Sequence, residues 1–423
     1  MSGIVHASTS LLRSSFQFSR LIDTFRDLCK DRLLLFALSH DTPDLEHSVK
    51  QLSSCTQETL GCLSGPLPAK RDNPFFSCSI AVVDKNAGTP FGTLITGGGP
   101  TRVGRWHTYA TERREHNGDL NPWNSRTEIN WNEIWSPKST TQFLPQELRN
   151  VRDVRTLVYF SDDSSWDFAT AIHNHLPQSH QLGIMASPTP FVTGQPFTLF
   201  RNGKMQSTGA VGIALQTGLV KNVLTFDGLV RLTQPLPIKR AEGNLIHELG
   251  DSLPARILLK AIQDVGLPND LAKNVDYYIG IRDAGMVDDI SPRLGRIIAG
   301  SPSRGSIAVE DVPAPPVGTS IEFYYRPKTS PVQLSENVLQ HNTNGSDALF
   351  GAIVDNAESA QINNQGQTLP GELKDLPFET YNSSFITSSE CGLVLNTDGL
   401  RRATMPWKCT VPSAFSGLVI PMR

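Results

Sequence analysis

Residues 32–39 read RLLLFALS, an apolar run that has the length of a strand and is too short to span a membrane. A continuous run of this kind is typical of a strand that is buried on both faces of a sheet. A polar stretch follows, in which Leu45, Val49 and Leu52 have helical spacing, and residues 60–66 then read LGCLSGP. The sequence therefore predicts a strand, a helix and a second strand that ends in small residues.

The same pattern occurs a second time. Residues 155–163 read RTLVYFSDD, a second strand with the character of a buried one. A helix is predicted from about Ser165 to Leu176, with Asp163 or Ser164 as its N-cap and a proline after it. Residues 182–188, LGIMASP, close the unit. We interpret the two copies as a weak internal repeat of two βαβ units with right-handed crossovers.

After residue 188 the pattern indicates β-structure. Strands are predicted at 191–194, 196–200 and 209–215, and Asn202-Gly203 has the composition of a hairpin turn. Further short strands are predicted at 277–282, 296–299, 306–309 and 320–325, followed by another apolar element at 347–354 and a polar surface loop at 355–376.

One helix interrupts this β-rich region. It is predicted from Pro254 to Val265, with Ser252 as its N-cap and Gly266 as its end.

The region between the two repeat copies has a different composition. Residues 75–99 predict hairpin strands that end in the glycine triplet Gly97–Gly99. Residues 101–138 hold four of the six tryptophans, together with several arginines, and predict a long loop or insertion. Because Trp and Arg are frequent in binding hot spots, one interpretation is a lid or protein-binding segment. The other is a loop that packs its own aromatic side chains onto the body of the protein.

Composition excludes several classes of partner. The chain has 423 residues and a net charge of −3, without a basic run, so we expect no nucleic-acid binding. It has no apolar stretch long enough for a membrane span. Its six cysteines include no CxxC pair, which favours free thiols in a reducing compartment and argues against a structural zinc site.

The N-terminal residues allow two interpretations. Residues 1–20 contain Arg13, Arg20 and several serines but no acid, which is the composition of a mitochondrial transit peptide. The favoured interpretation is a strand at 3–7 followed by an amphipathic helix, because the apolar residues from Phe18 to Cys29 keep helical spacing. We therefore predict a cytoplasmic protein, with a mitochondrial location as the alternative.

Several stretches together resemble the FIST-domain proteins of fungal type. The densest are residues 189–215 and 232–262, and in the second of these Asn244, Ile246, Glu248, Leu249, Pro254 and Ala255 fit the family pattern. Residues 296–300, 305–307 and 318–323 fit its later part. The resemblance implies a FIST N-like half, 1–217, that contains the insertion at 101–138, and a FIST C-like half, 218–423, without an F-box.

The resemblance also carries expectations about fold and function. It implies an α+β fold with mixed, largely antiparallel sheets flanked by helices, and a sensory or signal-transduction module that binds a small molecule. A bacterial branch of the family is linked to haem and nitric oxide, which makes His247 the formal candidate for an axial ligand. Two stretches depart from the family pattern, because residues 63–66 and 415–420 lack acids that the family often has there. The alternatives are a metabolic enzyme on the same scaffold and a protein-interaction adaptor.

Polar residues at strand ends are the best candidates for ligand contacts. Asp162 and Asp163 end one predicted buried strand, and Ser187 ends the matching strand. In α/β sheets the carboxyl ends of parallel strands face the ligand crevice, although Asp163 also suits a helix cap. Arg282 and Arg296, in the later short strands, complete the set of candidate ligand-binding residues.

No familiar catalytic or metal motif accompanies them. Neither Gly-x-Ser-x-Gly nor a phosphate-binding loop is present. Cys62 near a strand end is a formal nucleophile, but a buried thiol is the favoured interpretation. His173 and His175 lie two positions apart on a predicted helix and cannot share a metal there. Asp288-Asp289 is interpreted as a solvated pair. The cofactor and any catalysis stay undefined.

Overall fold

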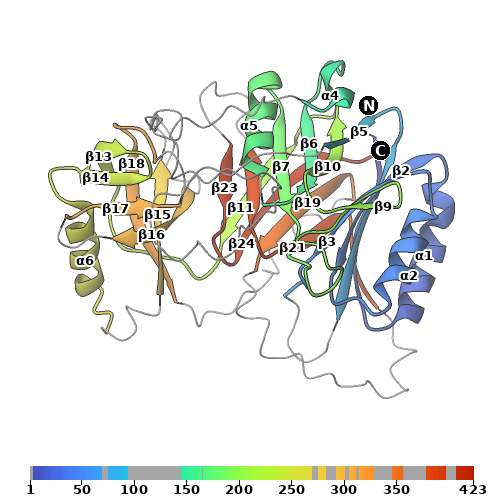
Figure 1. The fold of residues 1–423 in the computed structure, drawn as a ribbon, viewed down its shortest axis with the longest axis horizontal. Helices are drawn as coiled ribbons and strands as arrows, with labels where there is room; N and C mark the ends of the chain where they lie inside the picture. Colours follow the sequence, from blue (N-terminus) through green and yellow to red (C-terminus); the bar gives the residue numbers. More distant parts are fainter. Residues whose placement is uncertain are drawn as a thin grey trace, which may run out of the picture.

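The computed structural model has four β-sheets, and helices pack on the outer faces of some of them (Figure 1). This is the predicted α+β class, with mixed and largely antiparallel sheets. The structure describes residues 3–68, 75–93, 144–163, 165–268, 275–282, 292–300, 304–310, 314–327, 345–355, 378–396 and 406–423. Within these residues no helix is both long and apolar enough to cross a membrane. The predicted insertion at 101–138, the glycine triplet and the loop at 355–376 lie outside them, apart from Asp355.

Sheet A contains the first strand–helix–strand unit. Its seven strands run in the order β20 (Glu379–Asn382), β1 (Ile4–Leu12), β4 (Phe76–Asp84), β2 (Arg32–Ser39), β3 (Glu58–Ser64), β8 (Leu199–Arg201) and β9 (Lys204–Gln206). Helix α2 (Leu45–Ser53) connects β2 to β3, and these two strands are parallel. The predicted Asn202-Gly203 turn joins β8 to β9 and has positive φ at both residues.

Strand β2 alternates between two cores, which explains its continuous apolar sequence. Leu33, Leu35 and Ala37 face one apolar core, which we call the central core. Leu34, Phe36 and Leu38 face the helices on the other side of the sheet. Helix α1 (Ser15–Cys29) covers that outer face with the residues predicted from its spacing, among them Phe18, Leu21 and Ile22. Ser14 caps α1 by accepting a hydrogen bond from the Gln17 N–H.

Sheet C contains the second unit. Its strands run in the order β23 (Trp407–Cys409), β22 (Leu393–Asn396), β7 (His180–Met185), β6 (Thr156–Ser161), β10 (Ala210–Leu215) and β5 (Gly88–Thr93). Helix α5 (Ser165–His175) connects the parallel strands β6 and β7, as predicted, and the short helix α4 (Gln146–Arg149) lies near β5. The two predicted βαβ units are therefore both present.

Sheet B lies with sheets A and C around the central core. Its strands run in the order β11 (Lys221–Phe226), β24 (Ala414–Pro421), β19 (Asp347–Val354) and β21 (Ser384–Ser389), and β19 and β21 are parallel. Thr9 of sheet A donates a hydrogen bond to the Ser384 carbonyl at 2.7 Å and accepts one from the Ile386 N–H at 2.8 Å. These buried bonds hold the first residues of β21 against sheet A.

The fourth sheet forms a small barrel beside the other three, at the left of Figure 1. Its strands are β12 (Val230–Arg231), β18 (Ser320–Pro327), β13 (Leu236–Glu242), β14 (Leu245–Leu249), β17 (Ile307–Val309), β16 (Arg293–Gly300) and β15 (Val275–Arg282), and β15 also pairs with β18. Helix α6 (Pro254–Asp264) packs on it. Trp407 joins the barrel to sheet C by donating its indole N–H to the Leu294 carbonyl at 3.0 Å.

Three local predictions are wrong. The strands within 75–99 do not form a hairpin: β4 pairs with β1 and β2 in sheet A, whereas β5 pairs with β10 in sheet C. Both edges of β4 are already occupied, so β5 cannot pair with it. Residues 191–194 form turns rather than a strand. Helix α6 begins at Pro254, but its N-cap is Leu253 and not Ser252.

Strands of the second predicted half complete the sheets of the first. Strand β20 lies at one edge of sheet A, and β22 and β23 extend sheet C beyond β7. The division at 217/218 falls between β10 and β11, which belong to different sheets. The two-half organisation stays a prediction.

Candidate functional site

The carboxyl ends of three parallel strand pairs meet at one place. These pairs are β2–β3, β6–β7 and β19–β21, one from each of the three sheets around the central core. The Gly65 N–H donates to the Ser388 carbonyl at 3.1 Å, and the Ser187 N–H donates to the Leu63 carbonyl at 3.1 Å. The Ser389 hydroxyl donates to the Met185 carbonyl at 2.7 Å. The backbone thus ties the three strand ends together, where ligands of α/β sheets commonly bind.

Three side-chain oxygens surround Gly65 at this junction. A methyl group on Gly65 would lie 3.2 Å from Ser388 Oγ and 3.4 Å from both Glu390 Oε1 and Ser187 Oγ. Even a methyl group at this position would be in close contact with all three oxygens, so glycine lets them approach the backbone here. We call Gly65, Ser187, Ser388, Glu390 and His40 the strand-end cluster.

Two of these oxygens are buried without a hydrogen-bond partner. Ser187 is 0% and Ser388 is 1% exposed. Neither hydroxyl forms a hydrogen bond within the part of the chain that the structure describes. Leaving a buried hydroxyl unpaired costs roughly 1–3 kcal/mol, so such groups call for an explanation. A bound ligand that reaches both hydroxyls would supply one.

His40 and Glu390 form the solvent-facing side of the cluster. His40 Nε2 lies 3.1 Å from Glu390 Oε1, and their side chains are 24% and 15% exposed. The hydrogen bond to Glu390 raises the pKa of His40 above its ordinary value of 6.5, and burial opposes this increase. His40 is therefore protonated more readily in the folded protein, and when protonated it forms a partly buried ion pair with Glu390.

The turn after β21 holds Glu390 in place. The Ser389 hydroxyl accepts a hydrogen bond from the Gly392 N–H at 3.0 Å, in addition to the one that it donates. Cys391 follows Glu390, and burial is the main cause that raises the pKa of its thiol to about 11. Asp163 is close enough to contribute to that increase. A buried hydroxyl thus fixes the turn from which Glu390 projects.

The predicted ligand-binding residues do not all lie together. Ser187 is in the strand-end cluster, and Asp163 is an exposed neighbour of Cys391. Asp162 is buried, and its Oδ2 accepts a hydrogen bond from the Gly209 N–H at 2.9 Å, which holds the start of β10 next to β6. We therefore assign Asp162 a structural contact.

The two predicted arginines lie in the barrel, in a different sheet from Ser187. Arg282 Nε donates to Glu322 Oε1 at 2.8 Å, and Glu322 is fully buried. Arg296 forms an ion pair with Asp276 at 2.9 Å. These ion pairs give both arginines contacts within the barrel.

The remaining sequence candidates have other surroundings. Cys62 is fully buried in the central core, and burial raises the pKa of its thiol, as expected for an unreactive cysteine. His247 is half-buried on β14, and His173 Nδ1 lies 3.1 Å from the Asn396 amide. No group of three His, Cys, Asp or Glu side chains among the described residues could hold a metal ion. Asp288-Asp289 lies outside those residues.

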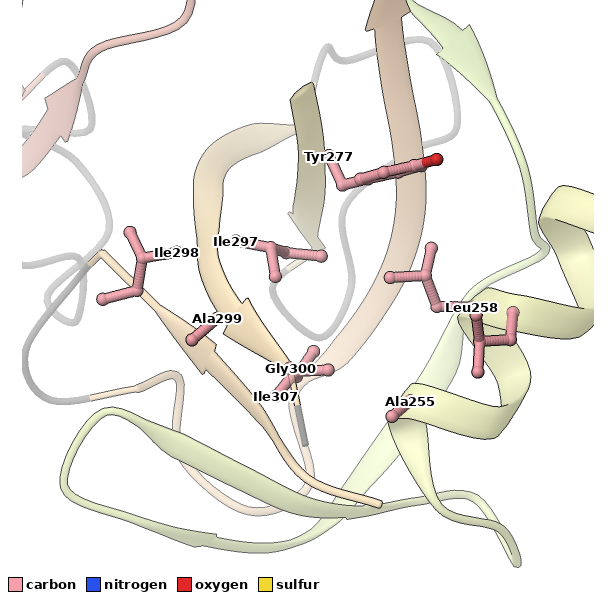
Figure 2. Close-up of a pocket in the computed structure, with 9 residues that line it drawn as sticks. Ala255, Leu258, Tyr277, Ile297, Ile298, Ala299, Gly300 and Ile307 are labelled. Atoms are coloured by element: carbon pink, nitrogen blue, oxygen red, sulfur yellow. The ribbon is translucent and has the colours of Figure 1, made fainter. Parts of the chain in front are cut away.

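Two pockets lie away from the strand-end cluster. One, of about 230 Å³, lies between α6 and strands β15–β17 of the barrel. Figure 2 shows its lining, which is apolar except for the Tyr277 hydroxyl. Another, of about 460 Å³, is lined by residues that include Leu148, Arg149 and His175. None of the described lining residues of either pocket has a buried polar side-chain atom without a partner. The strand-end cluster differs from both in this respect.

Comparison with protein-family models and with curated proteins gives no relative from which residue roles could be transferred. No protein-family model matches the chain, and no curated protein matches it. The functional reasoning therefore depends on the geometry of the strand-end cluster.

Four cluster residues were not among the sequence candidates. His40 directly follows a predicted strand and Gly65 is one of the small residues at the end of another, so the strand-end rule that selected Ser187 could have found them. Ser388 and Glu390 had no such local signal, because their position depends on the pairing of β21 with β19 and on contacts with sheet A.

Proposed function

We propose that this protein is a FIST-type sensory module that binds a small polar molecule at the strand-end cluster. The observation that supports this proposal is the pair of fully buried, unpartnered hydroxyls of Ser187 and Ser388. Both lie close to Gly65, as does Glu390 of the partly exposed His40–Glu390 pair. A ligand that enters past His40 and Glu390 would meet the hydroxyls at the inner end of the site.

The surroundings also suit a binding site on a rigid scaffold. The strands that position these residues are buried on both faces, and hydrogen bonds between sheets fix their ends. Rigid elements hold binding groups more accurately than loops do. As part of the proposal we place the protein in the cytoplasm, which agrees with six cysteines that are all free.

A thermal-shift screen of the full-length protein with a broad metabolite panel tests the proposal. A ligand at about one hundred times its Kd stabilises the native state by roughly 2.7 kcal/mol and raises the melting temperature. Each hit is then measured with Gly65→Ala, which puts a methyl group between the three oxygens.

Gly218→Ala is the matched control, because a methyl group there meets no atom within 4 Å. We expect at least one hit that Gly65→Ala weakens and Gly218→Ala leaves unchanged. A broad panel without a hit, or hits that are all insensitive to Gly65→Ala, would refute the proposal.

A further inference from the structure

We infer that the pocket between α6 and strands β15–β17 of the barrel binds an uncharged, apolar ring of about the size of toluene. This inference goes beyond the proposed function, because it concerns a second site that shares no lining residue with the strand-end cluster. The pocket has a volume of about 230 Å³. An apolar cavity of about 150 Å³ is large enough to bind benzene, so this pocket has room for a single ring.

The pocket lies where two strands of the barrel stop pairing. The ladder between β15 and β16 ends at Tyr278 and Arg296, although β15 begins earlier, at Val275, and β16 continues to Gly300. Over its last residues β16 pairs with β17 instead. Helix α6 supplies the opposite wall of the pocket (Figure 2). Ligand sites are common where a β-barrel opens.

The lining favours an uncharged occupant. Among the described residues that line the pocket none is charged, and the Tyr277 hydroxyl is the only polar side-chain group. A charged ligand group would lose its hydration here without gaining an ionic partner from the lining. Leu259 and Ile298 line the pocket and are exposed to solvent. A bound apolar ring would remove part of this apolar surface from water, which is favourable.

A small molecule suits this pocket better than a protein surface does. A stable protein interface covers about 800 Å² on each partner, and its centre is enriched in aromatic side chains and arginine. Of the described lining residues, Leu259 and Ile298 are the exposed large apolar ones, and both are aliphatic. The exposed part of the lining is therefore small, whereas the volume behind it fits one ring.

Methyl NMR of the full-length protein, with toluene as the probe at millimolar concentration, tests the inference. Benzoate and benzylamine are the comparison probes, because each carries the same ring with a charge. We expect toluene to shift the methyl signals of Ile297 and Ile307, which line the pocket. The two charged probes should bind about fivefold more weakly or less.

Two substitutions of exposed residues on or next to α6 locate the binding. Leu259 and Val265 are 48% and 46% exposed, but only Leu259 lines the pocket. Leu259→Asp places a charge at the rim and should weaken toluene binding about fivefold or more. Val265→Asp is the matched control and should change the affinity by less than about twofold.

Several outcomes would overturn the inference. It is wrong if toluene leaves the two methyl signals unshifted, if either charged probe binds as tightly, or if both variants weaken binding equally. It is also wrong if sedimentation shows a dimer that Leu259→Asp dissociates and Val265→Asp does not, because a second copy would then cover the pocket. The methyl shifts are measured on the wild type, so they decide the inference even if Leu259→Asp does not fold. None of these measurements involves the strand-end cluster, so they leave the proposed function to its own test.

Discussion

Ser388 and Ser389, two neighbouring residues at the end of β21, should affect the stability of the protein in opposite directions when each is changed to alanine. Ser388 and Ser389 are 1% and 0% exposed, so their burial is equal. Ser388 Oγ has no hydrogen-bond partner among the described residues. Ser389 Oγ donates to the Met185 carbonyl and accepts from the Gly392 N–H. Change to alanine removes one oxygen in either case, and only the hydrogen bonds differ.

The expected magnitudes follow from these contacts. Ser388→Ala removes a buried, unpaired hydroxyl and should raise the free energy of unfolding of the unliganded protein by about 1 kcal/mol. Ser389→Ala leaves a buried N–H and a buried carbonyl without this partner, so it should lower that free energy by roughly 2–4 kcal/mol. A gain in stability at a binding residue is expected when the site is shaped for a ligand rather than for the fold.

Urea denaturation of the wild type and the two variants, without added ligand, measures the difference. Tryptophan fluorescence and circular dichroism should both place the Ser388→Ala midpoint above the wild type and the Ser389→Ala midpoint below it. If Ser388→Ala lowers the midpoint as much as Ser389→Ala does, the Ser388 hydroxyl has a stabilising partner in the unliganded protein. The reasoning that makes it a ligand contact would then be wrong.

Three further predictions concern the sheets and the ionic pair. Gly212→Ala should reduce stability by more than about 2 kcal/mol, as measured by urea denaturation, because its methyl group would lie 2.6 Å from the Val158 carbonyl oxygen. Thr9→Val should cost roughly 2–3 kcal/mol in the same assay, since it removes the buried bonds to β21. The difference in free energy of unfolding between the wild type and Glu390→Gln should have its full value below about pH 6.5. It should disappear as the pH rises through the pKa of His40, which the charged neighbours Glu390 and Asp41 raise. An NMR titration of His40 that gives a pKa at or below 6.5 would contradict this.

Local sequence patterns predicted the strands that build the site. The continuous apolar runs at 32–39 and 155–163 identified strands buried on both faces, because each face of β2 and of β6 packs against a different core. The helices that follow them were recognisable from apolar spacing, so both parallel pairs could be predicted. Ser187 was found as a candidate because it follows the second strand of such a pair.

Long-range pairing set the limit of what could be predicted. His40 and Glu390 lie 350 positions apart in the chain, and their contact requires that the end of β21 reach sheet A. Nothing in the residues around 384–390 indicates a parallel partner at β19. The hairpin predicted within 75–99 was wrong for the same reason. Strand β4 pairs with β1 on one edge and β2 on the other, so β5 pairs with β10 instead.

The affinity of the tightest metabolite from the thermal-shift screen, measured by calorimetry in Ser187→Ala/Ser388→Ala, tests the central claim most directly. Loss of two hydrogen bonds to the ligand should weaken binding roughly tenfold or more, while the unliganded variant stays at least as stable as the wild type. An unchanged affinity in this stably folded double variant would contradict the claim that the strand-end cluster is the binding site.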